Sequence, residues 1–208
     1  LIAVGCAEPI PRNLDDLSMQ GPQYLDPETL EPYSGPAYRM SEDDSTQIVL
    51  RVNLRDGRFH GDFEDFDPER VEEGVGLYET GTYRNGQLEG RYEYFYPSGV
   101  LRGRGTYENG EAEGPYESYY ENGQLRESSH FKDGELDGPF ESYYENGQLW
   151  VKGTFKDNEY HGPQESYDRN GQLRFKGTRN MGEQCGEWFE DGETVAHLLC
   201  PPGLQDGD

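Results

Sequence analysis

Short runs of aromatic and β-branched residues alternate with polar turns along most of the chain. The runs at residues 116–120 and 149–155 have the length of a strand and are rich in Tyr, Phe, Trp and Val, which strands favour. Dipeptides such as Asn122-Gly123 and Asp133-Gly134 separate the runs, and they suit the positive φ angles of tight hairpin turns. The pattern predicts an all-β fold, an antiparallel meander in which strands and turns alternate.

The same unit recurs every 24 residues, and five glycines share this spacing: Gly90, Gly114, Gly138, Gly162 and Gly186. Two longer units precede them, so the units begin near residues 35, 61, 90, 114, 138 and 162. We therefore expect an elongated, twisted β-hairpin repeat solenoid over residues 35–185, with about two strands in each repeat. A truncated capping repeat and a tail are expected over residues 186–208.

The turns also predict which residues face one another. A two-residue hairpin loop at Asn122-Gly123 places Tyr120 opposite Leu125, and it places Tyr119 opposite Arg126. Residues opposite one another share a face of the sheet. Each repeat therefore sorts into two faces.

The inner face is expected to be the buried one, because it collects most of the Phe, Leu and Val residues of each repeat. On this face Phe140 is predicted to lie opposite Gly153 and to cover it with its ring. Such a ring replaces the packing that a strand glycine lacks.

The outer face carries a column of glutamates with aromatic residues beside them. Predicted ion pairs across the strands are Glu93–Arg104, Glu141–Lys152 and Glu165–Lys176. One interpretation is a solvated face with weak ion pairs, each contributing about 0–1 kcal/mol. The other is a recognition surface, with aromatic anchors and charges that orient a partner. We favour recognition for the face as a whole, and the candidate partner-binding residues are Tyr119, Tyr143, Trp150, Tyr167, Glu117, Glu141 and Glu165.

Composition and charge narrow the classes of partner. The 208-residue chain has a formal net charge of −24 and is only 32% hydrophobic, a combination typical of disorder, but 13% of its residues are aromatic. The negative charge argues against binding to nucleic acid and to anionic lipid surfaces. No run approaches the ~20 apolar residues of a membrane-spanning helix. The expected partner is a protein, and a basic one fits the charge.

Residues with catalytic or metal-binding chemistry do not stand out. His60 and His161 occupy the same repeat position, so they belong to the repeat pattern. Paired carboxylates recur in every unit, whereas catalytic residues are normally singular, and no nucleophile or phosphate-loop motif is present. We therefore expect no enzyme activity, no cofactor and no metal site. A hydrolase that uses the carboxylate-lined face is the less favoured alternative.

The second half of each unit resembles the MORN repeat. Residues 153–162 carry its order of glycine, aromatic residue, turn and closing glycine, and residues 81–90, 105–114 and 177–186 share the register. The Tyr-Tyr-Glu-Asn-Gly-Gln-Leu segment before it is typical of the longer bacterial variant, which occurs in proteins resembling the YwqK-type antitoxin family. The resemblance implies a monomeric, non-catalytic repeat protein that binds and neutralises a cognate toxin. A scaffold or spacer of the cell envelope is the alternative.

The N-terminal residues point to the cell envelope. Residues 1–6 form a short apolar run that ends in Gly-Cys, which resembles the lipobox of bacterial lipoproteins and makes Cys6 the candidate lipidation site. Residues 1–34 are therefore expected to be this start followed by a flexible acidic, proline-rich tether. The protein would face the periplasm, on the outer membrane of a Gram-negative cell. A cytoplasmic location is the alternative.

Two further cysteines lie close to the C-terminus. Cys185 and Cys200 flank the truncated last repeat and could bridge it as a cap. In an oxidising compartment a disulfide is expected, whereas in the cytosol they would be two free thiols.

Overall fold

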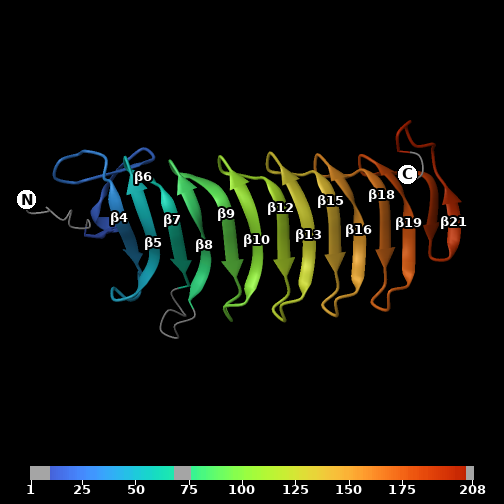
Figure 1. The fold of residues 1–208 in the computed structure, drawn as a ribbon, viewed down its shortest axis with the longest axis horizontal. Coiled ribbons are helices and arrows are strands. Elements are labelled where there is room, and N and C mark those ends of the chain that lie inside the picture. Colours follow the sequence, from blue (N-terminus) through green and yellow to red (C-terminus); the bar gives the residue numbers. More distant parts are fainter. Residues whose placement is uncertain (1–9, 68–75, 205–208) are drawn as a thin grey trace, which may run out of the picture. The chain divides into compact units, whose positions relative to one another are not determined.

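The computed structural model describes residues 10–67 and 76–204, which fall in two compact units, residues 1–99 and 100–208 (Figure 1). Each unit is described by itself. The candidate lipidation site Cys6 lies outside the described residues. Within the described ranges, no helix is long and apolar enough to cross a membrane.

In the first unit an antiparallel meander follows a short N-terminal segment. The N-terminal segment comprises β1 (Arg12–Asn13), the 3-10 helix η1 (Leu14–Asp16), β2 (Ser18–Gln20) and β3 (Gln23–Leu25). The meander comprises β4 (Gly35–Met40), β5 (Ile48–Arg55), β6 (Arg58–Phe59), β7 (Gly61–Phe66), β8 (Leu77–Arg84) and β9 (Gln87–Phe95). β1 pairs with β4 in parallel, and the meander strands pair antiparallel with their neighbours.

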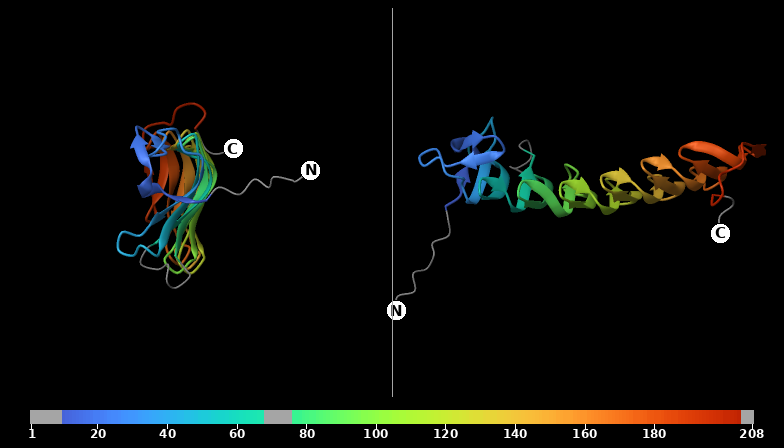
Figure 2. Two further views of the ribbon diagram at one scale, coloured as in Figure 1. Left: turned by 90° about the vertical axis from the view of Figure 1, so that its left-hand side faces the viewer. Right: turned by 90° about the horizontal axis from the view of Figure 1, so that it is seen from above.

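Most of the second unit repeats one pattern, a six-residue strand, an eight-residue strand and a two-residue strand, and its last two strands, of eight and four residues, depart from it (Figure 1). Its strands are β10 (Leu101–Glu108), β11 (Glu111–Ala112), β12 (Gly114–Tyr119), β13 (Leu125–Lys132), β14 (Glu135–Leu136), β15 (Gly138–Tyr143), β16 (Leu149–Lys156), β17 (Glu159–Tyr160), β18 (Gly162–Tyr167), β19 (Leu173–Asn180), β20 (Glu183–Glu190) and β21 (Glu193–Ala196). Figure 2 shows these strands following one another in a single layer of sheet. The predicted all-β antiparallel meander of hairpins, with repeats of 24 residues, is confirmed.

The repeat glycine marks a kink in the strand that returns from each tight turn. β14 and β15 both pair with β13, and they are separated by Asp137 alone. The Asp137 N–H donates to the His130 carbonyl at 3.0 Å, and Gly138 follows with φ +123°. A Cβ on Gly138 would lie 3.1 Å from the Cβ of His130. The conformation and the close approach together favour glycine here.

The two kinds of turn in each repeat differ in length. At Asp133-Gly134 both residues have positive φ, 50° and 80°, as the predicted two-residue hairpin requires. The expected two-residue loop at Asn122-Gly123 is wrong. The Tyr120 N–H donates to the Gln124 carbonyl at 2.8 Å, so three residues form the loop, and only Gly123 has positive φ.

The longer loop places a β-bulge beside it and changes the predicted register. Tyr119 lies opposite Leu125, whereas the sequence predicts Arg126, and Arg126 becomes the extra residue of the bulge. Trp150 and Arg174 occupy the same bulge position in the next two repeats. A bulge changes the direction of the side chain that it inserts. Farther from the loop the predicted register holds.

The N-terminal segment is not the expected flexible tether between residues 10 and 34. Leu14, Leu17 and Leu25 are buried, with exposed fractions of 2%, 8% and 7%. The first two join Val52, Leu54 and other residues of the sheet in one hydrophobic cluster. The prolines and acidic residues of this segment suggest a tether, but its leucines bury enough apolar surface to hold it against the sheet.

Aromatic rings of the inner face pack on one another, but most stay half-buried because no second layer covers them among residues 100–204. Phe140 and Phe155 lie 5.1 Å apart, and Phe155 and Tyr160 lie 4.1 Å apart between ring centroids. The buried residues of this face are largely small and polar. Three serines share one repeat position and have exposed fractions of 2%, 7% and 2%: Ser118, Ser142 and Ser166.

Rings cover strand glycines, although not always the predicted ring. Phe140 lies opposite Gly153 as expected, yet the ring nearest to a Cβ on Gly153 is that of Tyr160, at 3.2 Å. The tightest contact is at Gly177. Trp188 has an exposed fraction of 1%, and its ring would lie 2.2 Å from a Cβ on Gly177.

A disulfide joins Cys185 to Cys200 beside this tryptophan, with a Cα–Cα distance of 4.9 Å. Its Cys200 sulfur lies 3.3 Å from the position of a Cβ on Gly186. The Trp188 indole N–H donates to the carbonyls of Thr178 and Cys185. The hairpin of β20 and β21 is therefore fixed by a buried ring and a covalent bond.

Replacing Leu14 by Ala should lower the free energy of unfolding by about 2–5 kcal/mol, because it leaves a cavity in the cluster of the first unit. Urea denaturation followed by tryptophan fluorescence and circular dichroism measures the change. Met19→Ala is the matched control, since Met19 is 60% exposed on the same segment. Equal effects of the two variants would show that the segment is not packed as described.

Replacing Gly177 by Ala should cost about 1–3 kcal/mol, because the new methyl group would overlap the Trp188 ring. Gly153→Ala should cost less, since its Cβ would stay 3.2 Å from the nearest atom. Thermal unfolding of both variants compares the two sites. A Gly177→Ala protein as stable as Gly153→Ala would contradict the described position of Trp188.

Candidate functional site

One row of side chains crosses the outer face of the second unit, with one residue from each long strand. The register places each member opposite the next. In order, the row is Arg104, Glu117, Ser128, Glu141, Lys152, Glu165, Lys176 and Phe189. Basic and acidic residues alternate along most of it. The row contains all three glutamates that the sequence analysis selected.

A tyrosine two residues further along the strand holds each of these glutamates. The Tyr119 hydroxyl donates to Glu117 at 2.7 Å, and Tyr143 donates to Glu141 in the same way. The Tyr167 hydroxyl donates to Glu165 at 2.5 Å. These three tyrosines are half-buried. Six of the seven selected residues therefore form three equivalent Glu–Tyr pairs.

Ion pairs order the two ends of the row. Arg104 contacts Glu117 through two nitrogens, at 2.5 and 2.7 Å. Glu165 accepts from both neighbouring lysines, Lys152 at 2.8 Å and Lys176 at 3.0 Å. The predicted pair Glu165–Lys176 is confirmed. Glu141 lies opposite Lys152 as predicted, but the lysine ammonium contacts Glu165, because Lys152 lies between the two carboxylates in the row.

These contacts fix the ionisation of the row. Burial raises the pKa of Glu165, but hydrogen bonds from Lys152, Tyr167 and Lys176 outweigh it and lower the pKa to about 2. Hydrogen bonds from Tyr119 and Arg104 likewise lower the pKa of Glu117. The hydrogen bond to Glu141, helped by burial, raises the pKa of Tyr143 to about 12. Glu117 and Glu165 are therefore held in fixed positions and in their charged form at neutral pH.

Trp150 does not belong to this row. As the extra residue of the bulge, it stacks on Tyr144, with ring centroids 5.6 Å apart and an angle of 32° between the ring planes. The sequence analysis assigns Trp150 to the outer face beside the glutamates. Its side chain instead lies at the three-residue turn, where 48% of the residue is exposed.

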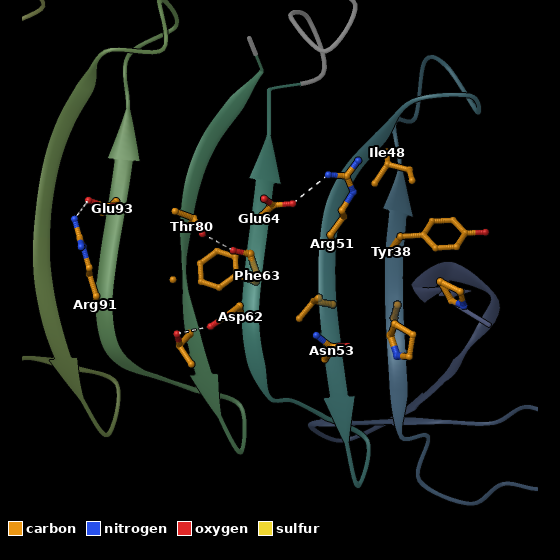
Figure 3. Close-up of a pocket in the computed structure, with 16 residues that line it drawn as sticks. Tyr38, Ile48, Arg51, Asn53, Asp62, Phe63, Glu64, Thr80, Arg91 and Glu93 are labelled. Atoms are coloured by element: carbon orange, nitrogen blue, oxygen red, sulfur yellow. Dashed lines mark hydrogen bonds and ion pairs between the residues drawn. The ribbon is translucent and has the colours of Figure 1, made fainter. Parts of the chain in front are cut away.

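The corresponding row in the first unit forms the floor of a groove of about 600 Å³ (Figure 3). Its members, again from successive strands, are Tyr38, Arg51, Glu64, Thr80 and Glu93. Pro11, Pro36 and Ile48 add apolar lining. The groove thus combines apolar walls with ordered charges, a common composition for a binding site.

Polar contacts hold the groove residues in place. Arg51 pairs with Glu64 at 3.1 Å, and its guanidinium lies 4.9 Å from the centre of the Phe66 ring. The Thr82 hydroxyl donates to Asp62 at 2.8 Å, and Arg91 pairs with Glu93 (Figure 3). Ordered side chains of this kind lose little conformational entropy when a partner binds.

Sequence reasoning missed the groove and the turn cluster around Trp150. The groove depends on Tyr38 and Ile48, which stand in a diverged repeat that gives no consensus signal. The turn cluster has a signal that could have found it. Trp150 and Arg169 stand where neighbouring repeats carry arginine and glutamate, respectively.

Among residues 10–67 and 76–204, no group of three or more His, Cys, Asp or Glu side chains is placed to hold a metal ion. The site that the geometry offers is a surface of ordered charges and aromatic rings.

The MORN repeat variant, a known repeat family, matches four segments of the chain: residues 88–109, 112–133, 136–157 and 160–180. The chain therefore contains MORN repeats, as the resemblance at residues 153–162 predicts. The resemblance to YwqK-type antitoxins stays a prediction. A comparison with curated proteins finds no match.

Acidification should weaken the fold partly through Glu165. Because its pKa is about 2 in the folded protein and 4.5 ordinarily, its contribution is complete above pH 4.5 and is lost as the pH falls toward 2. Glu165→Gln should therefore lose less stability than the unchanged protein between pH 5 and pH 2.5, measured as the urea midpoint. Glu121→Gln, at an exposed turn, controls for the removed charge. Identical pH profiles for Glu165→Gln and the unchanged protein would contradict the lowered pKa.

Proposed function

We propose that this MORN-repeat protein is a non-catalytic binding protein of the antitoxin or immunity type, which neutralises a basic cognate toxin at the cell envelope. The observation that carries the proposal is the row of carboxylates on the outer face. Each glutamate is held by a tyrosine hydroxyl, and one of them by two lysines as well. A partner meets this surface without first having to order it.

Charge supports a basic partner. The chain has 42 acidic and 18 basic residues, so a positively charged protein is attracted from a distance and its encounter is accelerated. Close to the surface, the fixed alternation of charges along the row selects a complementary arrangement of charges on the partner. The groove of the first unit offers apolar contact area beside charges of the same kind.

Location in the envelope is supported by two features. The disulfide between Cys185 and Cys200 suits an oxidising compartment such as the periplasm. The apolar Gly-Cys start at residues 1–6 suits lipid anchoring through Cys6. A monomer with such an anchor would present its outer face to toxins that arrive from outside the cell.

The second candidate function is an envelope scaffold or spacer that has no toxin partner. The single-layer repeat architecture favours it, because stacked repeats present a long surface on which other proteins can assemble. The two functions differ in one measurable respect. Only an antitoxin protects a cell from a toxin.

The test is co-expression with a basic secreted toxin encoded by an adjacent gene. A triple variant, Glu117→Gln/Glu141→Gln/Glu165→Gln, should lose protection and bind the toxin at least tenfold more weakly by isothermal titration calorimetry. The loss follows because the row's carboxylates would no longer carry charge. Tyr119→Ala/Tyr143→Ala/Tyr167→Ala should have the same effect in a protein that circular dichroism shows to be folded.

The matched control is Glu111→Gln/Glu135→Gln/Glu159→Gln. It removes three exposed glutamates from one repeat position away from the row, so the net charge changes equally. Equal weakening by both triple variants would mean that net charge alone attracts the toxin. Full protection by the row variants would refute the assigned face, and a folded protein that protects against no adjacent toxin would favour the scaffold.

A further inference from the structure

The repeat pattern is broken at one turn by two residues that lie close together. At the bulge, the preceding and following repeats carry Arg126 and Arg174, whereas this repeat carries Trp150. In the turn of the next repeat, Arg169 stands where the two preceding repeats have Glu121 and Glu145. Trp150 and Arg169 both contact the ring of Tyr144.

The backbone frame around this turn is the same as in its neighbour. The Tyr144 hydroxyl donates to the Tyr167 carbonyl at 3.0 Å, and the Asn146 amide donates to the Arg169 carbonyl at 3.0 Å. One repeat earlier, Tyr120 and Asn122 make the equivalent bonds, at 2.7 and 3.2 Å. The frame forms in the earlier repeat with Arg126 in place of Trp150 and Glu145 in place of Arg169, so neither Trp150 nor Arg169 is needed to build the turn.

What the two residues add is one contact each to the Tyr144 ring, and this cluster of three side chains is called the stack. The ring of Trp150 lies 5.6 Å from the ring of Tyr144, and the Arg169 guanidinium carbon also lies 5.6 Å from the centre of the Tyr144 ring. Beside the stack is a hollow of about 350 Å³, lined by Tyr144, Glu145, Asn146 and Arg169. Trp150 keeps 48% of its surface exposed, so it contributes little to a core.

We propose that the stack of Trp150, Tyr144 and Arg169 is a binding site for a carboxylate group of a protein partner. An apolar group of the partner lies next to that carboxylate. The site rests on the proposed binding function but is separate from the glutamate row. Trp, Tyr and Arg are the residues most enriched among those that dominate the energy of protein interfaces.

The chemistry of the arginine selects an anion. A guanidinium that stacks on a ring keeps its in-plane N–H donors for a ligand, and their fork matches a carboxylate. Arg169 stands where the two earlier turns have a glutamate, so the local charge is two units more positive than in those turns. The whole chain has a net charge of −24. The exposed indole supplies the apolar surface that the neighbouring group of the ligand would cover.

The experiment uses 3-phenylpropanoate as the probe and its neutral amide, 3-phenylpropanamide, as the matched ligand. Binding is followed through the indole N–H signal of Trp150 in ¹⁵N-labelled full-length protein. The signal is distinguished from that of Trp188 by its absence in Trp150→Arg. The carboxylate should bind at least fivefold more tightly than the amide.

Two variants restore the residues of the neighbouring repeats, so their folding is expected to be unaffected. Arg169→Glu should abolish the preference for the carboxylate over the amide. Trp150→Arg should abolish saturable binding of both probes. Because Trp150→Arg lacks the indole signal, binding to this variant is followed through the backbone amide signals of residues 144–146. Arg126→Glu changes the charge equally at the bulge of the preceding repeat and should leave binding intact.

Equal affinity for the carboxylate and the amide, unchanged binding in Arg169→Glu, or no saturable shift in the unchanged protein would each overturn the site. These outcomes are independent of the toxin experiment. If the row variants lose toxin binding while the probes do not bind, only the stack is wrong. If the probes bind as expected and no toxin is neutralised, the stack stands and the antitoxin function fails.

Discussion

Main-chain hydrogen bonding between successive hairpins is the interaction on which this structure depends. A sheet one layer thick exposes both faces, so no thick core can form. Among the described residues of the second unit, the buried hydrophobic residues are Cys185, Trp188 and Cys200. Each strand is instead held by the next one along the chain, and half-buried rings and small buried serines fill the space between repeats. The low apolar content of the chain follows from this architecture.

Repeats that lack a neighbour need another way to bury their exposed rings and edges. In the first unit, residues 10–34 supply it, since Leu14 and Leu17 cover Val52, Leu54 and Phe63 in one cluster. In the second unit, the ring of Trp188 closes over Gly177 and the disulfide fixes the last hairpin. The two devices differ in chemistry but serve the same purpose within their own units.

The regular pairing also creates the candidate surfaces. Because opposite residues recur at a fixed register, carboxylates and basic side chains form ordered rows, and the tyrosines two positions away hold the carboxylates. Regularity explains a surface of ordered charges, but it cannot by itself explain specificity for one partner. Specificity needs residues that do not recur in every repeat. Such residues lie in the stack around Tyr144 and in the groove beside Tyr38.

The sequence by itself determined the repeat, the all-β meander and the faces far from the loops. It could do so because hairpin turns and strand alternation are local and recur every 24 residues. Three features were decided only by the tertiary structure. They are the bulge that brings Trp150 to Tyr144, the ion pair of Lys152 with Glu165 in place of Glu141, and the packing of residues 10–34. The bulge depends on whether the loop has two or three residues. The ion pair depends on which of two neighbouring carboxylates the lysine ammonium reaches. The packing of a non-repeating segment depends on contacts between residues that are distant in the chain. The ion pair and the packed segment leave no periodic trace in the sequence.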